Sequence, residues 1–286
     1  MQNLYVGDIG DYVKFGILRA LLPGYRLGVA WWLFPDENHR KDRGHIGYLN
    51  RPEVWWHFDP QLFDALDGIV LTGQRDVQAL QRANILQGAI FASDLIPVDG
   101  PIVHRKQAWV EWFGNVQRVL EETNLVFVDP DNGLEPDRHN HGAAKSGKSV
   151  LMSELRALAR SGRCLIIYHH HTRRKGGHHS EIEHWADRLR DCGFSTVDAL
   201  RARPYSARVF FLLDAPVDIR QRADEIADRW RGMVTWHAGG VKVGAYLQVQ
   251  CRRKDVDDGA SRSRRARAAM PRRQNSVSPA MRLGLF

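Results

Sequence analysis

Short apolar runs alternate with amphipathic segments along most of the chain, and this alternation limits the possible folds more than any other feature. Uninterrupted apolar stretches, such as 27–34 and 125–128, are typical of strands that are buried on both faces of a parallel sheet. Segment 106–122 instead carries apolar residues at helical spacing. Strands alternating with helices predict an α/β protein with a mostly parallel sheet and helices on both faces.

The order of these segments predicts a Rossmann-like arrangement with an antiparallel edge, because a hairpin-like pair of strands follows the parallel ones. Strands are expected at 27–34, 68–71, 89–92, 125–128, 164–168, twice within 195–213, and at 241–249. One helix is expected to have its last residues at 17–22. Further helices are expected at 61–66, 76–86, 106–122, 150–159, 180–190 (capped by Ser180) and 217–230. Segment 131–147 is expected to be a loop.

Charge divides the chain into two parts. Residues 252–286 hold 10 Lys and Arg against 3 Asp and Glu, so they account for +7 of the net charge of +8. We therefore expect a Rossmann-like domain over residues 1–250 and a basic, disordered tail over residues 251–286. Such a tail can bind phosphate without sequence preference, which makes nucleic acid a possible partner.

Composition also bears on the cellular compartment. No apolar run approaches the length that a membrane span needs, and the first residues lack the pattern of a signal peptide. The three cysteines, Cys164, Cys192 and Cys251, are scattered and do not suggest a disulfide framework. We therefore expect no membrane partner and a cytoplasmic location, with Cys164 packed as a small apolar residue in a strand. The sequence does not indicate the oligomeric state.

The candidate site follows the apolar run 125–128, where the chain continues as Asp129-Pro130-Asp131-Asn132. Proline cannot continue a central strand, so the chain must turn there. Ligands of open α/β sheets bind outside the carboxyl ends of the strands, which is where these polar side chains are expected. The alternative is an ordinary turn, because Asp, Asn and Gly favour turns for local reasons.

This segment resembles the Asp-Pro-Pro-Tyr motif of the 23S ribosomal RNA adenine-N6 methyltransferases. That family begins with Gly, three residues, Asp, two residues and Lys, a spacing matched here by Gly7, Asp11 and Lys14. The strand at 165–168 and the stretches beginning at Arg203-Pro204 and ending at Asp214-Ala215-Pro216 are similar too.

The resemblance implies a methyltransferase-like enzyme that acts on nucleic acid with S-adenosylmethionine. It places catalytic residues at Asp129, Pro130, Asp131 and Asn132, and cofactor-binding residues at Gly7, Asp11, Lys14 and Asp36. Asp36 stands where the family has a glycine-rich turn after the first strand. Asp131 and Asn132 replace the family's second Pro and its base-stacking Tyr, so the target atom is left open.

The resemblance also makes a geometric prediction. Lys14 and Asp129 must face one cavity if the family chemistry is carried over, although they lie more than a hundred residues apart. Lys14 would then hold the carboxylate of Asp129 ionised. If the two side chains lay on opposite sides of the sheet, the histidine-rich segment described next would become the leading candidate site.

His169-His170-His171 supplies an alternative site, because imidazole and carboxylate ligands suit a divalent metal such as zinc or manganese. Together with Asp129 and Asp131, His169 or His170 could serve a metal-dependent nuclease or phosphodiesterase. Adjacent strand residues face opposite ways, so only part of the run can point at one site. A third hypothesis is a nucleic-acid-binding relative without catalysis.

The segment 142–149 matches the phosphate-binding P-loop pattern in every required letter. A working P-loop also needs a strand directly before its first Gly and a helix after its Lys-Ser. The polar stretch 135–141 precedes the match instead of a strand. We therefore expect a flexible loop without nucleotide binding.

Overall fold

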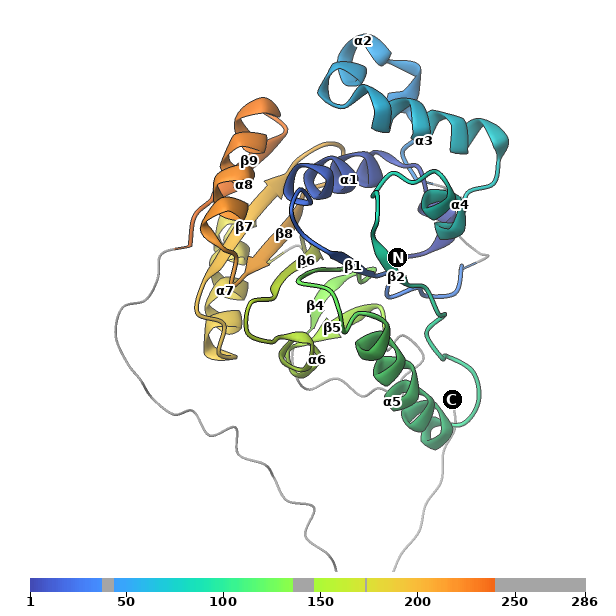
Figure 1. The fold of residues 1–286 in the computed structure, drawn as a ribbon, viewed down its shortest axis with the longest axis vertical. Coiled ribbons are helices and arrows are strands. Elements are labelled where there is room, and N and C mark those ends of the chain that lie inside the picture. Colours follow the sequence, from blue (N-terminus) through green and yellow to red (C-terminus); the bar gives the residue numbers. More distant parts are fainter. Residues whose placement is uncertain (38–43, 136–146, 173, 240–286) are drawn as a thin grey trace, which may run out of the picture. The chain divides into compact units, whose positions relative to one another are not determined.

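The sheet at the centre of the molecule has seven strands in the order β2-β1-β3-β6-β8-β7-β9 (Figure 1). The structure is a computed structural model that describes residues 1–37, 44–135, 147–172 and 174–239. The strands of the sheet are β1 (Leu27–Ala30), β2 (Ile90–Ala92), β3 (Leu125–Val128), β6 (Cys164–His170), β7 (Val197–Ala202), β8 (Arg208–Leu213) and β9 (Val234–His237). The expected strand at 241–249 and the basic tail at 251–286 lie outside the described residues.

The strand directions confirm the predicted fold class. Strands β2, β1, β3 and β6 are parallel to one another. Strand β8 pairs antiparallel with both β6 and β7, and β9 pairs antiparallel with β7. The chain is thus an α/β protein with a mostly parallel, Rossmann-like sheet that ends in antiparallel strands.

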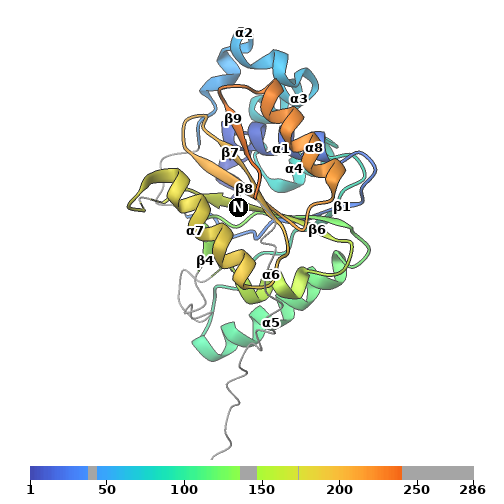
Figure 2. The same cartoon turned by 90° about the vertical axis from the view of Figure 1, so that its left-hand side faces the viewer.

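Helices cover both faces of the sheet and form two apolar layers (Figures 1 and 2). One layer contains α1 (Ile9–Leu21), α3 (Pro60–Thr72), α4 (Val77–Arg82) and α8 (Val217–Arg229). The other contains α5 (Ile102–Val119), α6 (Met152–Leu158) and α7 (Gly177–Asp191). The shorter elements are η1 (Asn3–Tyr5), η2 (Gly47–Asn50), α2 (Pro52–Trp55) and η3 (Trp56–Phe58). None of the helices in the described part of the chain has the length and apolarity to span a bilayer.

Strand β3 shows why its sequence is an unbroken apolar run. Leu125 and Phe127 pack into the layer that contains α1, whereas Val126 and Val128 pack into the layer that contains α5. All four side chains are fully buried. Each contributes about 1.5–3 kcal/mol through the burial of apolar area, so polar residues are excluded from both faces. The first polar side chain appears at the strand's end, at Asp129.

The strand order places a crevice at the carboxyl ends of β1 and β3. From β1 the chain goes to β2 on one side, and it then crosses back to form β3 on the other side. The connections before and after β2 run through opposite helical layers, α3 and α4 in one and α5 in the other. Such a switch in strand order is where open α/β sheets bind their ligands.

One predicted element is wrong, and another begins earlier than expected. Segment 68–71 is the last part of α3 and not a strand, because Leu62, Leu66 and Ile69 bury one helical face. Its apolar Leu71 is 78% exposed, which a buried strand would not allow. Helix α7 begins at Gly177, one turn before the predicted cap at Ser180.

The segment predicted as the loop 131–147 contains further regular structure. Strand β4 (Gly133–Glu135) pairs in parallel with β5 (Ser149–Leu151), and α6 starts only at Met152. Gly133 has φ +102°, and a Cβ there would collide with the ring of His169. This position therefore requires glycine, and β4 can lie directly against β6.

Candidate functional site

A cavity of about 260 Å³ lies at the carboxyl ends of the parallel strands, where Asp129 leaves β3. Its walls come from elements that are far apart in the sequence. They are the N-terminal segment and α1 (Met1, Tyr5, Asp8, Gly10, Asp11, Lys14), the loop at Gly44 and His45, the turn after β3 (Asp129, Pro130, Asp131, Asn132), the end of β6 (Tyr168, His170) and the start of β8 (Ser206, Arg208). This position agrees with the expected place of the site.

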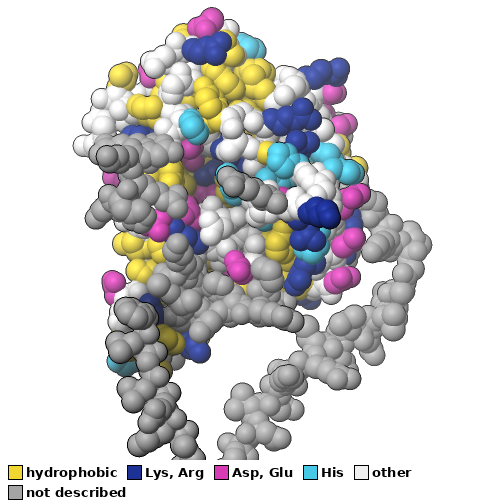
Figure 3. Space-filling model, turned by 180° about the vertical axis from the view of Figure 1, so that it is seen from behind, with side chains coloured by type: hydrophobic (Ala, Val, Ile, Leu, Met, Phe, Trp, Pro, Cys, Tyr) yellow, Lys and Arg dark blue, Asp and Glu magenta, His cyan; other side chains and the backbone are white. Residues whose placement is uncertain are grey.

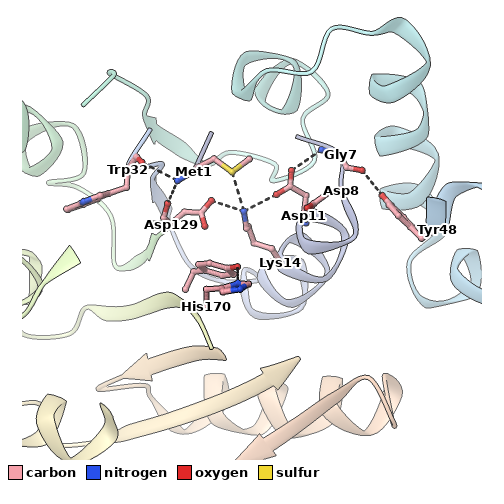
Figure 4. Close-up of polar contacts among 10 residues, drawn as sticks. Met1, Gly7, Asp8, Asp11, Lys14, Trp32, Tyr48, Asp129 and His170 are labelled. Atoms are coloured by element: carbon pink, nitrogen blue, oxygen red, sulfur yellow. Dashed lines mark hydrogen bonds and ion pairs between the residues drawn. The ribbon is translucent and has the colours of Figure 1, made fainter. Parts of the chain in front are cut away.

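Lys14 and Asp129 meet in this cavity, as predicted (Figure 4). The Lys14 ammonium donates to Asp129 Oδ2 at 2.7 Å and to Asp11 Oδ1 at 2.9 Å. The Gly7 N–H donates to Asp11 Oδ2 at 3.0 Å. Residues Gly7, Asp11, Lys14 and Asp129 thus form one connected chain of contacts, which we call the cavity network.

The cavity network holds two carboxylates and one ammonium away from water. The side chains of Lys14 and Asp129 are only 5% and 3% exposed. Burial alone would lower the pKa of Lys14, but Asp11 and Asp129 outweigh it and raise this pKa, so Lys14 is charged. Burial raises the pKa of Asp129, and Lys14 opposes this rise. Asp129 is therefore a carboxyl group whose proton affinity depends on its neighbours in the cavity.

Local sequence explains how α1 delivers its side chains. Asp8 caps the helix, since its Oδ1 accepts from the Asp11 N–H at 3.0 Å. Asp11 and Lys14, three residues apart, lie on the same side of the helix and can pair. A Cβ at Gly10 would lie 3.2 Å from an Arg208 nitrogen, so glycine gives that guanidinium room beside the helix.

Asp8 and Asp131 have pKa values shifted in opposite directions. Burial, and next the neighbouring Asp11, raise the pKa of Asp8 to about 6. Burial also favours a higher pKa for Asp131, but the N-terminal ammonium, Gln2 and Lys148 outweigh it and lower this pKa. Gln2 Nε2 donates to Asp131 Oδ2 at 2.6 Å. The cavity therefore contains a carboxylate that stays ionised and another that titrates nearer to neutral pH.

The other predicted site residues are divided between the cavity and the surface. Pro130 and Asn132 line the cavity, and the Asn132 N–H donates to the Lys148 carbonyl at 2.7 Å. Asp36 is exposed, does not line the cavity, and accepts a hydrogen bond from the Leu4 N–H at 3.2 Å. The structure thus brings together every predicted site residue of the turn after β3, but not Asp36.

Lys148 has a structural environment unlike that of a P-loop lysine. Its ammonium is buried, lies 2.7 Å from Glu37 Oε2 and lies 3.4 Å from Asp131 Oδ2. Ser149 opens strand β5 and not a helix. Residues 142–146 of the pattern lie outside the described residues. The described end of the segment therefore lacks the helix N-terminus that a P-loop uses to bind phosphate.

The three consecutive histidines do not form one site. His170 lines the cavity, whereas His169 and His171 point to the opposite side and contact Glu181 of α7, at 3.3 and 3.1 Å. Within the described ranges, no three or more His, Cys, Asp and Glu residues are grouped to hold a metal ion. Histidine side chains gather with Lys and Arg side chains on one side of the face in Figure 3. The alternative metal set is therefore only partly brought together: Asp129, Asp131 and His170 line the cavity, whereas strand alternation turns His169 away.

Arg208 and Asp8 are cavity residues that the sequence analysis missed. Arg208 lies in an apolar strand with the pattern of core residues, yet its side chain is buried beside the cavity. Asp8 carries an ordinary helix-cap signal. The sequence favours core packing for the tryptophan pairs 31–32 and 55–56; Trp31, Trp32 and Trp55 are buried, while Trp56 is 45% exposed. Cys164 is buried in β6, as expected.

Comparison with known proteins gives no match. No protein-family model matches the chain, and neither a curated protein nor a solved structure matches it. The function of the chain is therefore inferred from the geometry of the cavity and from the sequence resemblance.

Proposed function

We propose that the chain is a methyltransferase-like enzyme that acts on nucleic acid with S-adenosylmethionine. The observation that carries the proposal is the buried 2.7 Å contact between Lys14 and Asp129. The two motifs of the resemblance lie more than a hundred residues apart, yet hydrogen bonds connect Gly7, Asp11 and Lys14 of one motif to Asp129 of the other. A chance match of short motifs gives no reason for such convergence.

The cavity has a donor and acceptor set that fits S-adenosylmethionine, which carries an amino group, a carboxylate and a positively charged sulfur. Asp8, Asp129 and Asp131 offer carboxylate acceptors. Arg208 offers a guanidinium, and its Nε has no hydrogen-bond partner among the described residues. Tyr5 and Tyr168 add aromatic faces, which attract cations. When bound, the cofactor would supply an activated methyl group.

The chain's own residues have distinct parts in the proposed reaction. Lys14 fixes the Asp129 carboxylate and favours its ionised form. An ionised Asp129 can accept a hydrogen bond from an amine of the target base. Burial excludes water from this pair, which strengthens its electrostatic interactions. Asp131 and Asn132 shape the wall next to Asp129, and the identity of the target atom depends on that wall.

A metal-dependent nuclease is the weaker candidate. Its proposed ligands are divided between two sides of β6, and Asp129 already pairs with an ammonium. A nucleic-acid-binding protein without catalysis would have the same cavity, so only a measurement of activity distinguishes it from the proposed enzyme.

The proposal is tested by measuring the transfer of a radiolabelled methyl group from S-adenosylmethionine to purified ribosomal RNA or to single-stranded DNA. We expect transfer by the wild-type protein and at least a 100-fold loss in Asp129→Asn, which is nearly isosteric but lacks the charge. Asp228→Asn is the matched control, since Asp228 is 72% exposed on α8, pairs with the exposed Arg231 and does not line the cavity. Binding of RNA without transfer to any of these substrates would support the non-catalytic alternative.

A further inference from the structure

A strained and exposed tyrosine directly precedes Ser206, a residue of the cavity wall. Tyr205 has φ +59° and is 55% exposed, although bulky residues rarely adopt this left-handed conformation. Strain of this kind costs on the order of 1–3 kcal/mol and clusters at sites of function. Hydrophobic burial does not explain the conformation, because more than half of the side chain is exposed.

Tyr205 forms a stack with a residue of the cavity wall. Its ring lies 5.1 Å from the ring of His45, and the two planes differ by 17°. His45 lines the cavity, and its carbonyl accepts from the Ile9 N–H at the start of α1. We call His45 and Tyr205 the stacking pair.

Contacts beneath the stacking pair hold its loop in place. The Arg208 guanidinium donates to the Pro204 carbonyl at 3.2 Å and to Ser206 Oγ at 2.8 Å. Ser206 and Arg208 both line the cavity. The buried Arg208 therefore links the exposed Tyr205 loop to the place where Asp129 emerges.

We infer that the stacking pair is the platform for an unpaired nucleobase of the substrate, presented next to Asp129. This inference rests on the proposed function and names the substrate class, a single-stranded or unpaired nucleic-acid segment. Proteins recognise such bases by stacking them on aromatic side chains, Tyr and His among them. The position fits because the turn after β3 offers no aromatic side chain, with Asp131 and Asn132 at its tip.

The test compares two fluorescein-labelled probes of equal length by anisotropy without S-adenosylmethionine. One probe is single-stranded oligoadenylate, and the other has the same phosphates but abasic positions. Attraction of phosphates to the basic tail contributes to both probes, so their difference reports base stacking. We expect the wild-type protein to bind oligoadenylate more tightly, and Tyr205→Gly to lose about 5- to 100-fold of this preference. Tyr205→Phe should retain it.

Tyr205→Gly also separates binding from a structural role. Glycine adopts φ +59° without strain, so the melting temperature should equal or exceed that of the wild-type protein. Trp56→Ala, which removes another exposed aromatic side chain, should leave the probe preference unchanged. Equal binding of both probes by the wild-type protein, or unchanged preference in Tyr205→Gly, would overturn the inference. The anisotropy assay contains no cofactor, so its result does not depend on methyl transfer. Absence of methyl transfer in the radiolabel assay would therefore count against the proposed function alone.

Discussion

Side chains at the end of strand β6 lie in two different environments, one on each side of the strand. Tyr168 and His170 face the cavity with Lys14 and Asp129, whereas His169 and His171 face α7 and bind Glu181. We call His169, His171, Thr172 and Glu181 the Glu181 cluster. Both groups contain buried titratable side chains, but one lines a cavity and the other fills the space between a strand and a helix.

The two groups differ in the partners that their carboxylates have. Glu181 accepts from both histidines and from the Thr172 N–H and hydroxyl, and His169 Nδ1 accepts from the Leu134 N–H. Burial would raise the pKa of Glu181, but the hydrogen bonds from Thr172 and the histidines outweigh it and lower this pKa to about 2. The cavity network instead shares one ammonium between two carboxylates. A run of histidines can thus be divided between two environments while a less conspicuous Lys–Asp pair lines the cavity.

The largest expected effect comes from removing Lys14. Lys14→Met leaves Asp11 and Asp129 buried without their shared cation, which should reduce the free energy of unfolding by about 3–5 kcal/mol at neutral pH. Urea denaturation followed by circular dichroism measures this loss. The double variant Lys14→Met/Asp129→Asn should recover part of it, because one uncompensated carboxylate is gone. Equal stability of the single variant and the wild-type protein would show that the pair is not formed.

The Glu181 cluster should control how stability depends on pH. Burial lowers the pKa of His169 from 6.5 to about 4, and Glu181 offsets this only in part. Below pH 6.5 the unfolded chain binds a proton at this residue and the folded chain does not, so unfolding becomes easier. The free energy of unfolding should fall by about 3 kcal/mol by pH 4. His169→Asn, which keeps an acceptor for the Leu134 N–H, should make the free energy of unfolding depend less steeply on pH. An unchanged pH dependence would mean that other groups cause it.

Weakening the Glu181 cluster should affect the fold without affecting the cavity. Glu181→Gln removes the charge that strengthens the hydrogen bonds from Thr172 and the histidines, and should cost about 2 kcal/mol of unfolding free energy. Binding of oligoadenylate and of S-adenosylmethionine should stay within about twofold of wild type. A large loss of either binding, in a variant that still folds, would mean that the two sides of β6 act as one site.

The smallest expected effect is that of divalent metals. Mn²⁺ or Zn²⁺ should leave the melting temperature unchanged in differential scanning fluorimetry, with EDTA-treated protein as the reference, because no three His, Cys, Asp or Glu side chains of the described residues are grouped to hold a metal ion. A rise that saturates with metal and disappears in Asp131→Asn would instead favour the nuclease hypothesis.

Sequence patterns predicted the parts of the site that follow from local rules. The apolar run before Asp129 predicted a central strand and a ligand site at its end, because both depend on periodicity and on strand direction. The spacing of Gly7, Asp11 and Lys14 was recognised by resemblance, and its physical cause became clear only from the contact with Asp129. Segment 68–71 was misread, since a short apolar run does not distinguish a strand from a helix.

Features that depend on tertiary contacts could not be predicted. Arg208 reads as a residue of an apolar strand, and only the packing of α1 against β8 places it at the cavity. The left-handed conformation of Tyr205 has no local signal, because tyrosine disfavours it. The division of the three histidines was foreseen in part from strand alternation, but their binding to Glu181 depends on where α7 packs.

Isothermal calorimetry with S-adenosylmethionine tests the central claim, that the cavity around Lys14 and Asp129 is the functional site. Wild-type protein should bind the cofactor, and Asp131→Asn, which changes the cavity wall without breaking the Lys14–Asp129 pair, should bind it at least tenfold more weakly. Asp228→Asn, with the same change far from the cavity lining, and Glu181→Gln should match the wild-type affinity. No heat of binding with folded wild-type protein, or equal affinity in Asp131→Asn, would contradict the account.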